Sequence, residues 1–185
     1  KKIIDKPMIQ LLLERLSKSK EINEIIVATS DDKINDTLDE FVKSLGYSCT
    51  RGSENDVLGR FYYAAKENSA DVVVRITGDC PLVDPALVDQ VIQKYKTARV
   101  DYMSNTSPPT YPDGLDVEVF SFNALSKAQA ETNSKFDREH VTPYLRNGDV
   151  FTKDSVNYKQ DLSSFRWTVD EPDDLDVVTS VFEYF

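Results

Sequence analysis

The sequence has few of the features that mark zinc-binding, disulfide-rich or membrane proteins. Its 185 residues contain two cysteines, Cys49 and Cys80, and one histidine. The two cysteines form neither a zinc-binding spacing nor a disulfide framework, so we expect both thiols to be reduced, as in a cytoplasmic protein. No apolar run approaches the roughly 20 residues that a membrane-spanning helix requires, so we expect no membrane partner.

Several nucleotide-binding and catalytic motifs are also missing. The sequence has no G-x-x-x-x-G-K-S/T phosphate loop, no G-x-G-x-x-G dinucleotide motif and no G-x-S-x-G nucleophile turn. These absences exclude P-loop ATPases, classical dehydrogenases and α/β-hydrolases.

Positive charge is scarce. Lysine and arginine total 22 against 32 aspartates and glutamates, which gives a formal net charge of −10. Such a surface repels the phosphate backbone, so we expect no nucleic acid partner. A nucleoside triphosphate is also anionic, but backbone amides, a few cations and a divalent metal on carboxylates can bind it locally. The composition therefore leaves a nucleotide substrate open.

Short apolar strands alternate with amphipathic helices through the first hundred residues. Residues 1–10 are expected to run directly into the first helix. Apolar periodicity predicts helices at residues 7–17, 31–45, 57–65 and 87–95, and strands at residues 24–29, 47–50 and 71–77. This alternation predicts an α/β fold with a mostly parallel sheet covered by helices on both faces. Ligands bind such sheets beyond the carboxyl ends of the strands, here after Thr29, Thr50 and Thr77.

The second half is less regular. Residues 115–120 alternate between apolar and polar side chains, which predicts a strand with one wet face. Further strands are predicted at residues 150–156 and 165–169, and a closing helix at residues 171–185. No linker or repeat divides the sequence, so we expect one domain over residues 1–185.

The segment 75–85 is the strongest candidate for chemistry. A buried strand ends there, Gly78 allows the backbone to approach a ligand, and Asp79 follows at the carboxyl end of the strand. A carboxylate on a rigid element could hold Mg²⁺. Glycine and aspartate are also ordinary turn residues, and the pair taken alone favours a plain strand-to-helix turn.

A second carboxylate, Asp170, follows another short apolar run. It could face the same metal, since two carboxylates plus substrate phosphates commonly hold Mg²⁺. Alternatively, Asp170 is the N-cap of the closing helix, whose first turn contains the acidic residues Glu171, Asp173 and Asp174.

Residues 51–53, Arg51, Gly52 and Ser53, lead into a predicted helix N-terminus. Its free amides suit an anion or the edge of a base. The alternative is an ordinary capped helix with Ser53 as N-cap and Asp56 three residues later, close to a capping box.

Three polar residues of the second half are further candidates. Arg138 could bind a substrate carboxylate through two hydrogen bonds, or it could form a surface ion pair of little value. Glu118 could accept hydrogen bonds from substrate hydroxyls on the wet face of its strand. His140 is the only histidine, and a lone histidine is more often structural than catalytic.

Seven segments occur in an order that resembles the cytidylyltransferase family, which includes the CMP-sialate and CMP-KDO synthetases. The similarity is greatest to its spore coat polysaccharide biosynthesis protein F type. The segments span nearly the whole chain and comprise residues 6–9, 27–32, 51–58, 75–82, 111–120, 138–143 and 167–175.

The resemblance implies a Rossmann-like three-layer α/β/α fold with a mostly parallel mixed sheet, as in nucleotide-diphospho-sugar transferases. It implies CTP and a small sugar as substrates, Mg²⁺ as cofactor and, as often in the family, a homodimer. Asp79 and Asp170 match the catalytic, metal-binding aspartates. The nucleotide-binding positions are Arg51, Gly52, Ser53, Arg75 and Gly78, and those near the sugar pocket are Glu118, Arg138 and His140.

Members of the family open with a strand and a glycine-rich, basic loop that grips the triphosphate. The 185 residues start after that segment, so we expect a single nucleotidyltransferase domain that lacks this strand and loop and is inactive without them. Two other functions remain open. One is a glycosyltransferase that uses a nucleotide sugar, faintly suggested by the pair Asp116 and Glu118. The other is a non-catalytic binding or assembly module with the same fold.

Overall fold

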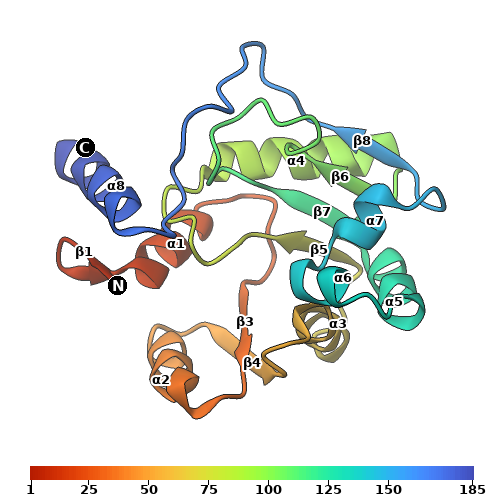
Figure 1. The fold of residues 1–185 in the computed structure, drawn as a ribbon, viewed down its shortest axis with the longest axis horizontal. Helices are drawn as coiled ribbons and strands as arrows, with labels where there is room; N and C mark the ends of the chain where they lie inside the picture. Colours follow the sequence, from red (N-terminus) through yellow and green to blue (C-terminus); the bar gives the residue numbers. More distant parts are fainter.

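Two sheets and a short hairpin contain the strands of the computed structural model, which describes residues 1–185 (Figure 1). One sheet is a parallel pair, and the other has four strands in the order β5-β7-β6-β8. In the four-stranded sheet, β7 runs antiparallel to β5 and β6, whereas β6 and β8 are parallel. The strands are β1 (Lys2–Ile3), β2 (Lys6–Pro7), β3 (Ile26–Ser30), β4 (Ser48–Gly52), β5 (Val72–Arg75), β6 (Tyr102–Ser104), β7 (Glu118–Ser121) and β8 (Lys153–Ser155).

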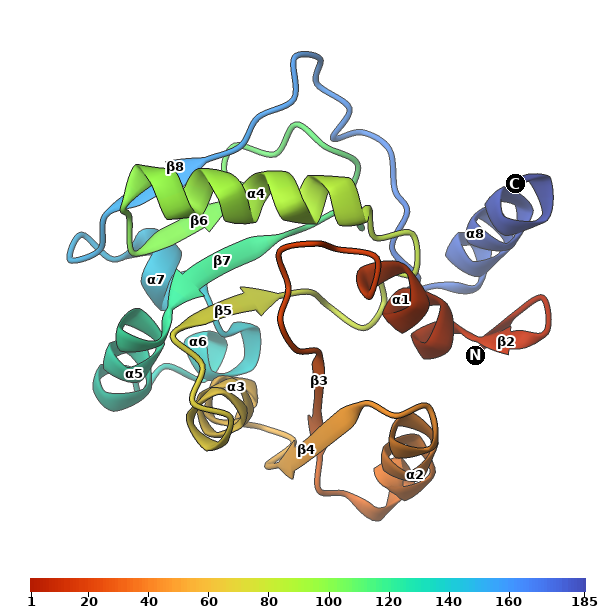
Figure 2. The same ribbon diagram turned by 180° about the vertical axis from the view of Figure 1, so that it is seen from behind.

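Helices cover both faces of the four-stranded sheet. Figure 2 shows α4 in front of β6 and β7, with α5, α6 and α7 on the opposite side. The α8 helix lies beside the β1–β2 hairpin at one end of the molecule. The helices are α1 (Met8–Leu16), η1 (Lys33–Asn35), α2 (Asp36–Ser44), α3 (Val57–Glu67), α4 (Pro85–Ala98), α5 (Phe122–Glu131), α6 (Lys135–His140), α7 (Pro143–Asn147) and α8 (Pro172–Tyr184).

The α4 helix shows how the sequence forms these elements. Asp84 is its N-cap and accepts a hydrogen bond from the backbone N–H of Ala86 at 2.9 Å, and Pro85 occupies the first turn. One face of α4 is buried in the larger hydrophobic core through Leu87, Val88, Val91, Ile92 and Tyr95. Each such buried aliphatic side chain contributes about 1.5–3 kcal/mol, so packing against the sheet stabilises this helix.

The two central strands are buried on both faces. Met103 and Val119 join the core beneath α4, whereas their neighbours Tyr102 and Phe120 join a second core with α5 and α7. Successive side chains of a strand point to opposite faces, so a strand between two helical layers is apolar throughout. The prediction that residues 115–120 form a strand with one solvent-exposed face is therefore wrong, since both Phe120 and Glu118 are buried.

The α/β class and the mixed sheet are confirmed, and every helix predicted in the first half is present. Three further expectations are wrong. A β-hairpin precedes α1 where a direct entry into the helix was expected. Residues 165–169 form no strand and make only an isolated bridge between Arg166 and Asp113. The strand expected at residues 150–156 is reduced to β8. None of the helices could cross a membrane, because each is too short or too polar.

Candidate functional site

Two chain segments meet beyond the carboxyl end of β5. The backbone N–H of Val169 donates to the carbonyl of Asp79 at 2.9 Å, and the Thr168 hydroxyl donates to the same carbonyl at 3.4 Å. This pairing brings the backbones of Asp79 and Asp170 close together, although they are ninety-one positions apart in the sequence. Asp79 is half-buried and Asp170 is exposed, so neither faces a dry interior.

The space next to Gly78 is open. A Cβ atom added to this residue would meet no atom within 4 Å, and the residue is exposed. Its backbone does not need glycine for conformational reasons, because its φ angle is outside the left-handed region. A ligand can therefore approach the backbone at this position, as the sequence predicts.

Arg166 binds three carboxylates near the carboxyl end of β5, a region that is called the rim from here on. Its guanidinium donates to Asp170 at 2.5 Å, to Asp174 at 2.9 Å and to Asp113 at 3.0 Å. Hydrogen bonds to Asp174 and Asp170 raise the pKa of Arg166, and the same guanidinium lowers the pKa of Asp174 to about 2. Arg166 is not among the predicted site residues, although its spacing of four and eight residues before Asp170 and Asp174 is compatible with pairing along one turn or two.

Asp170 is not the N-cap of the closing helix. Glu171 occupies that position, in a capping box with Asp174, whose carboxylate accepts from the backbone N–H groups of Asp170 and Glu171 at 3.0 and 2.9 Å. The carboxylate of Asp170 is therefore not used by the helix terminus.

The residues at the rim fit a magnesium ion that is shared with a substrate. No group of three or more histidine, cysteine or acidic residues is arranged to hold a metal. Mg²⁺ usually takes only one or two carboxylates and completes its shell with phosphates and water. Asp79 forms no ion pair and accepts only a weak hydrogen bond from the Cys80 thiol at 3.3 Å. The Asp170–Arg166 pair is exposed and contributes little, so a metal could replace it.

Gly114 packs tightly against the segment that leads to Asp170. The backbone N–H of Trp167 donates to Asp113, and an added Cβ on Gly114 would lie 2.5 Å from the backbone of Trp167 and Thr168. The φ angle of Gly114 is +102°, which favours glycine. This close approach fixes the course of the chain two residues before Asp116.

Burial, followed by the charges of Asp113 and Glu118, raises the pKa of Asp116 to about 6, and Asp79 also contributes. From the sequence, Asp116 is a candidate only as part of the Asp116–Glu118 pair.

A cavity of about 240 Å³ adjoins Asp116 and is named here the Glu118 cavity. It brings together three of the predicted site residues, Arg75, Glu118 and His140, and its lining comprises Arg75, Thr106, Asp116, Glu118, Phe136, His140, Thr142, Pro143 and Arg146. The ring of His140 packs against Phe136 with 4.4 Å between ring centroids.

The Glu118 carboxylate is bound by the protein itself. Arg75 Nη1 and the Tyr102 hydroxyl each donate to it at 2.5 Å, and only 4% of the residue is exposed. The strand register sets these contacts, because Arg75 lies opposite Glu118 across β5 and β7. Burial and the neighbouring carboxylate raise the pKa of Tyr102. Glu118 lines the cavity, but its oxygens are already occupied by two donors.

Arg138 lies outside the cavity lining. Its guanidinium donates to Asp56 at 3.2 Å and to the side-chain and backbone oxygens of Gln129 at 2.6 and 3.0 Å. These contacts join α6 to α5 and to the N-terminus of α3. Arg138 therefore forms an ion pair, which was the second of its two predicted roles. Its position gives no support to the first role, the binding of a substrate carboxylate.

Residues 51–53 lie at the end of β4, in the smaller sheet. Arg51 donates to Asp36 at 2.6 Å and to the backbone carbonyls of Ser30 and Asp32, which ties the ends of β3 and β4 together. The N-cap of α3 is Asp56, which accepts from the Gly59 N–H at 3.0 Å, so the capping role considered for Ser53 is wrong. The structure thus does not group these residues with those of the Glu118 cavity.

Carboxylates at the end of a strand in an α/β domain, beside a polar cavity, are typical of enzymes that bind a nucleotide with a divalent metal. The chain belongs to the cytidylyltransferase family, whose model matches residues 1–177.

The chain is also similar to individual known proteins. An uncharacterized protein of Methanocaldococcus jannaschii is 45% identical over 151 residues, which cover 81% of this chain and 61% of that protein. The spore coat polysaccharide biosynthesis protein SpsF of Bacillus subtilis is 30% identical over 95% of this chain and 75% of its own length. A solved cytidylyltransferase from Leptospira borgpetersenii superposes with a TM-score of 0.93 at 33% identity, over 98% of this chain and 77% of that chain. The chain thus spans about three-fifths to three-quarters of the length of these relatives.

Proposed function

We propose that this chain is the main part of a cytidylyltransferase that activates a sugar with CTP. A hydroxyl oxygen of the sugar attacks the α-phosphorus of CTP, the bond from that phosphorus to the bridging β-phosphate oxygen breaks, and pyrophosphate leaves. The observation that carries the proposal is the backbone pairing of the Asp79 and Asp170 segments at the end of β5, in a chain of this family. Such a reaction depends on positioning and on stabilising charge.

Asp79 and Asp170 are the residues that would hold Mg²⁺, together with phosphate oxygens of the substrate. The ion would offset charge on the α-phosphate and on the departing pyrophosphate. Gly78 offers open backbone for the nucleotide, and Arg166 keeps the carboxylate of Asp170 at the rim until a metal competes for it. Residues 51–53 are proposed to contact the base, and their position at a strand end supports this role.

The sugar is proposed to bind in the Glu118 cavity, with Arg75 and His140 among its contacts. A role in polysaccharide synthesis is supported by the name of the Bacillus subtilis relative. Within this proposal Glu118 holds Arg75 in place, because both of its oxygens already accept hydrogen bonds.

The test is a screen for pyrophosphate release by the full-length protein. Four nucleoside triphosphates are offered with a panel of sugars and Mg²⁺, and we expect release only with CTP and one class of sugar. Asp79→Asn should lower kcat at least about a hundredfold, as expected from the loss of several kcal/mol of transition-state stabilisation. Asp149→Asn, an exposed residue with no side-chain hydrogen bond, is the matched control. Activity of Asp79→Asn near that of the control would remove Asp79 from the mechanism.

A glycosyltransferase is the second candidate, because Asp116 and Glu118 both line the cavity. Such an enzyme would release a nucleoside diphosphate from a nucleotide sugar and would release no pyrophosphate from CTP and a free sugar. The occupied oxygens of Glu118 make this candidate the weaker one.

A further inference from the structure

The backbone at Val141 is strained. Its φ and ψ angles are +70° and −56°, and the backbone N–H of Thr142 donates to the carbonyl of His140 at 2.8 Å. These angles, with a hydrogen bond that spans one residue, define the rare form of γ-turn that has a positive φ at its centre. A positive φ is unfavourable for a β-branched residue, because the branched Cβ crowds the backbone.

Val141 is also the one buried residue of this kind. Four residues other than glycine have a positive φ, and the other three, Ile4, Ser69 and Arg99, are exposed. Val141 is 0% exposed and belongs to the second hydrophobic core, together with Leu145 of α7. A glycine would adopt this φ without strain but would have no side chain to bury. The burial of the valine therefore offsets the strain of the turn.

The γ-turn joins α6 to α7, and both helices contribute to one wall of the Glu118 cavity. Val141 is not in the lining, since its side chain is buried in the core. The opposite side of the cavity comes from β5, β7 and the loop between β6 and β7. Five of the nine lining residues lie on either side of the turn, and they are Phe136, His140, Thr142, Pro143 and Arg146.

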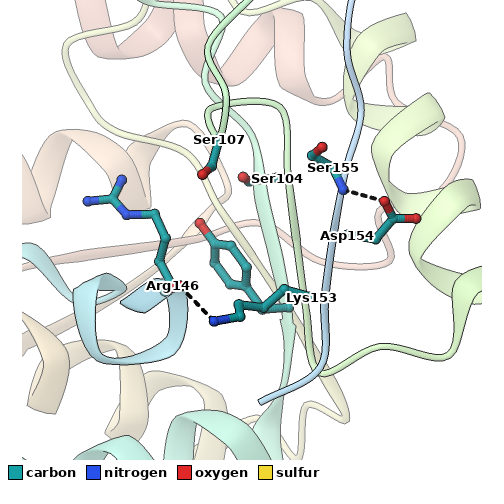
Figure 3. A pocket seen from close by; sticks show the side chains of 7 residues that line it. Ser104, Ser107, Arg146, Lys153, Asp154 and Ser155 are labelled. Carbon is teal, nitrogen blue, oxygen red and sulfur yellow. Dashed lines mark hydrogen bonds between the residues drawn. The ribbon is translucent and has the colours of Figure 1, made fainter. Parts of the chain in front are cut away.

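Contacts at both ends hold the two helices in place. Arg138 joins α6 to α5 and to the N-terminus of α3. Near the C-terminal end of α7, Lys153 Nζ donates to the carbonyls of Arg146 and Gly148 at 3.1 and 2.8 Å, and Figure 3 shows the Lys153 amino group beside the backbone of Arg146. Arg146 also lines a second cavity, of about 260 Å³, beside β6 and β8. The two anchored helices thus meet at Val141, whose conformation sets the angle between them.

We propose that Val141 is a positioning residue for the Glu118 cavity, because its buried side chain holds the strained turn that keeps His140 and Arg146 at the cavity wall. Without this anchor the backbone relaxes toward a negative φ, and α6 and α7 shift relative to each other. The effect falls on the ligand of this cavity, which is the sugar in the proposed function on which this inference rests. The nucleotide at the end of β5 is not affected.

Val141→Ala in the full-length protein removes most of the anchor. The KM for the sugar found in the pyrophosphate-release screen should rise about tenfold, whereas kcat and the KM for CTP should change less than about twofold. This split is expected when a contact common to the bound substrate and the transition state is lost.

Val141→Gly tests the strain itself. Glycine adopts a φ of +70° freely, so Val141→Gly should melt at a higher temperature than Val141→Ala. At an unstrained position with a negative φ the order is reversed, because glycine loses more conformational freedom on folding than alanine does.

His140 provides a measurement that needs no substrate. It is the only histidine, so its Hε1 proton gives one resonance of its kind in the NMR spectrum. The position of this resonance depends on the aromatic and charged groups around the ring, which include Phe136 at 4.4 Å between ring centroids. We expect the resonance to move in Val141→Ala.

Leu125→Ala is the matched control. Leu125 is 0% exposed in the same core, lies on α5 and is outside the cavity lining. It should lower the melting temperature at least as much as Val141→Ala does, and it should leave the sugar KM and the His140 resonance unchanged.

Three results would overturn the proposal. They are an equal rise of the sugar KM in Leu125→Ala, an unchanged sugar KM and His140 resonance in Val141→Ala, and a melting temperature of Val141→Gly below that of Val141→Ala. If no sugar releases pyrophosphate from CTP, the proposed function fails alone, and the His140 resonance and the order of melting temperatures still decide whether Val141 positions the cavity wall.

Discussion

Two arginine–carboxylate pairs of equal length lie in very different surroundings. Arg75 and Glu118 are 2.5 Å apart, with 19% and 5% of their side chains exposed, whereas Arg166 and Asp170 are also 2.5 Å apart with 45% and 53% exposed. Breaking a buried pair leaves an uncompensated charge in the interior, while an exposed pair is already well solvated. The buried pair therefore fixes the cavity wall, and the exposed pair is the one that the proposed metal would have to displace.

Removal of the buried carboxylate should have the largest effect on stability. Glu118→Ala leaves the Arg75 guanidinium and the Tyr102 hydroxyl without their partner, which should lower the free energy of unfolding by about 3–5 kcal/mol. Urea unfolding measures the change. Glu118→Gln keeps an acceptor for Tyr102 and should cost less. A loss below about 1 kcal/mol for Glu118→Ala would show that the pair is not buried in solution.

Gly114→Ala should rank second. The new Cβ would lie 2.5 Å from backbone atoms of Trp167 and Thr168 at a φ of +102°, so the loop before β7 must shift. Left-handed strain of this kind costs about 1–3 kcal/mol. Gly78→Ala is the matched control, because open space surrounds it, and it should change the unfolding free energy by less than about 0.5 kcal/mol. Equal effects of the two substitutions would contradict this account of the loop.

Asp116→Asn should remove a pH dependence of stability. The folded-state pKa of Asp116 is raised from 3.8 to about 6, so the folded protein binds this proton more tightly than the unfolded chain does. Stability should therefore fall as the pH rises from about 4 to about 6, by about 2 kcal/mol in total. Thermal unfolding of wild type and variant across that range, without Mg²⁺, measures the difference. Parallel profiles would show that Asp116 does not titrate abnormally.

Local pattern explains which parts of the fold could be predicted. The α4 helix has a cap, an N-terminal proline and a continuous apolar face, and β3 is a run of β-branched residues, so both were found. The β6 strand has only three residues, and α5 buries mainly alanines, so neither has a clear period. The run at 165–169 is apolar but pairs irregularly with Asp113 and Asp79, which no local pattern indicates.

The candidate site was predicted in part for a related reason. Asp79, Gly78 and Arg75 follow directly from a strand end, which the sequence displays. Whether an arginine side chain forms an ion pair depends on tertiary contacts. Arg138 pairs with Asp56, whereas Arg146 pairs with no carboxylate. The alternation around Glu118 predicts a wet face, because a sequence cannot show that Arg75 and Tyr102 will lie against that carboxylate.

Asp170→Asn should have the smallest effect on stability and a large one on activity. Its carboxylate is exposed, makes one ion pair with Arg166 and caps no helix, so the unfolding free energy should change by less than about 1 kcal/mol. If the same carboxylate holds Mg²⁺ with Asp79, pyrophosphate release should fall at least about a hundredfold. Asp173→Asn, in the first turn of α8, is the control for loss of one acidic charge there. A stable and fully active Asp170→Asn variant would show that the Arg166–Asp170 pair is only a surface contact. The Arg166–Asp170 and Arg75–Glu118 pairs would then differ in burial and not in function.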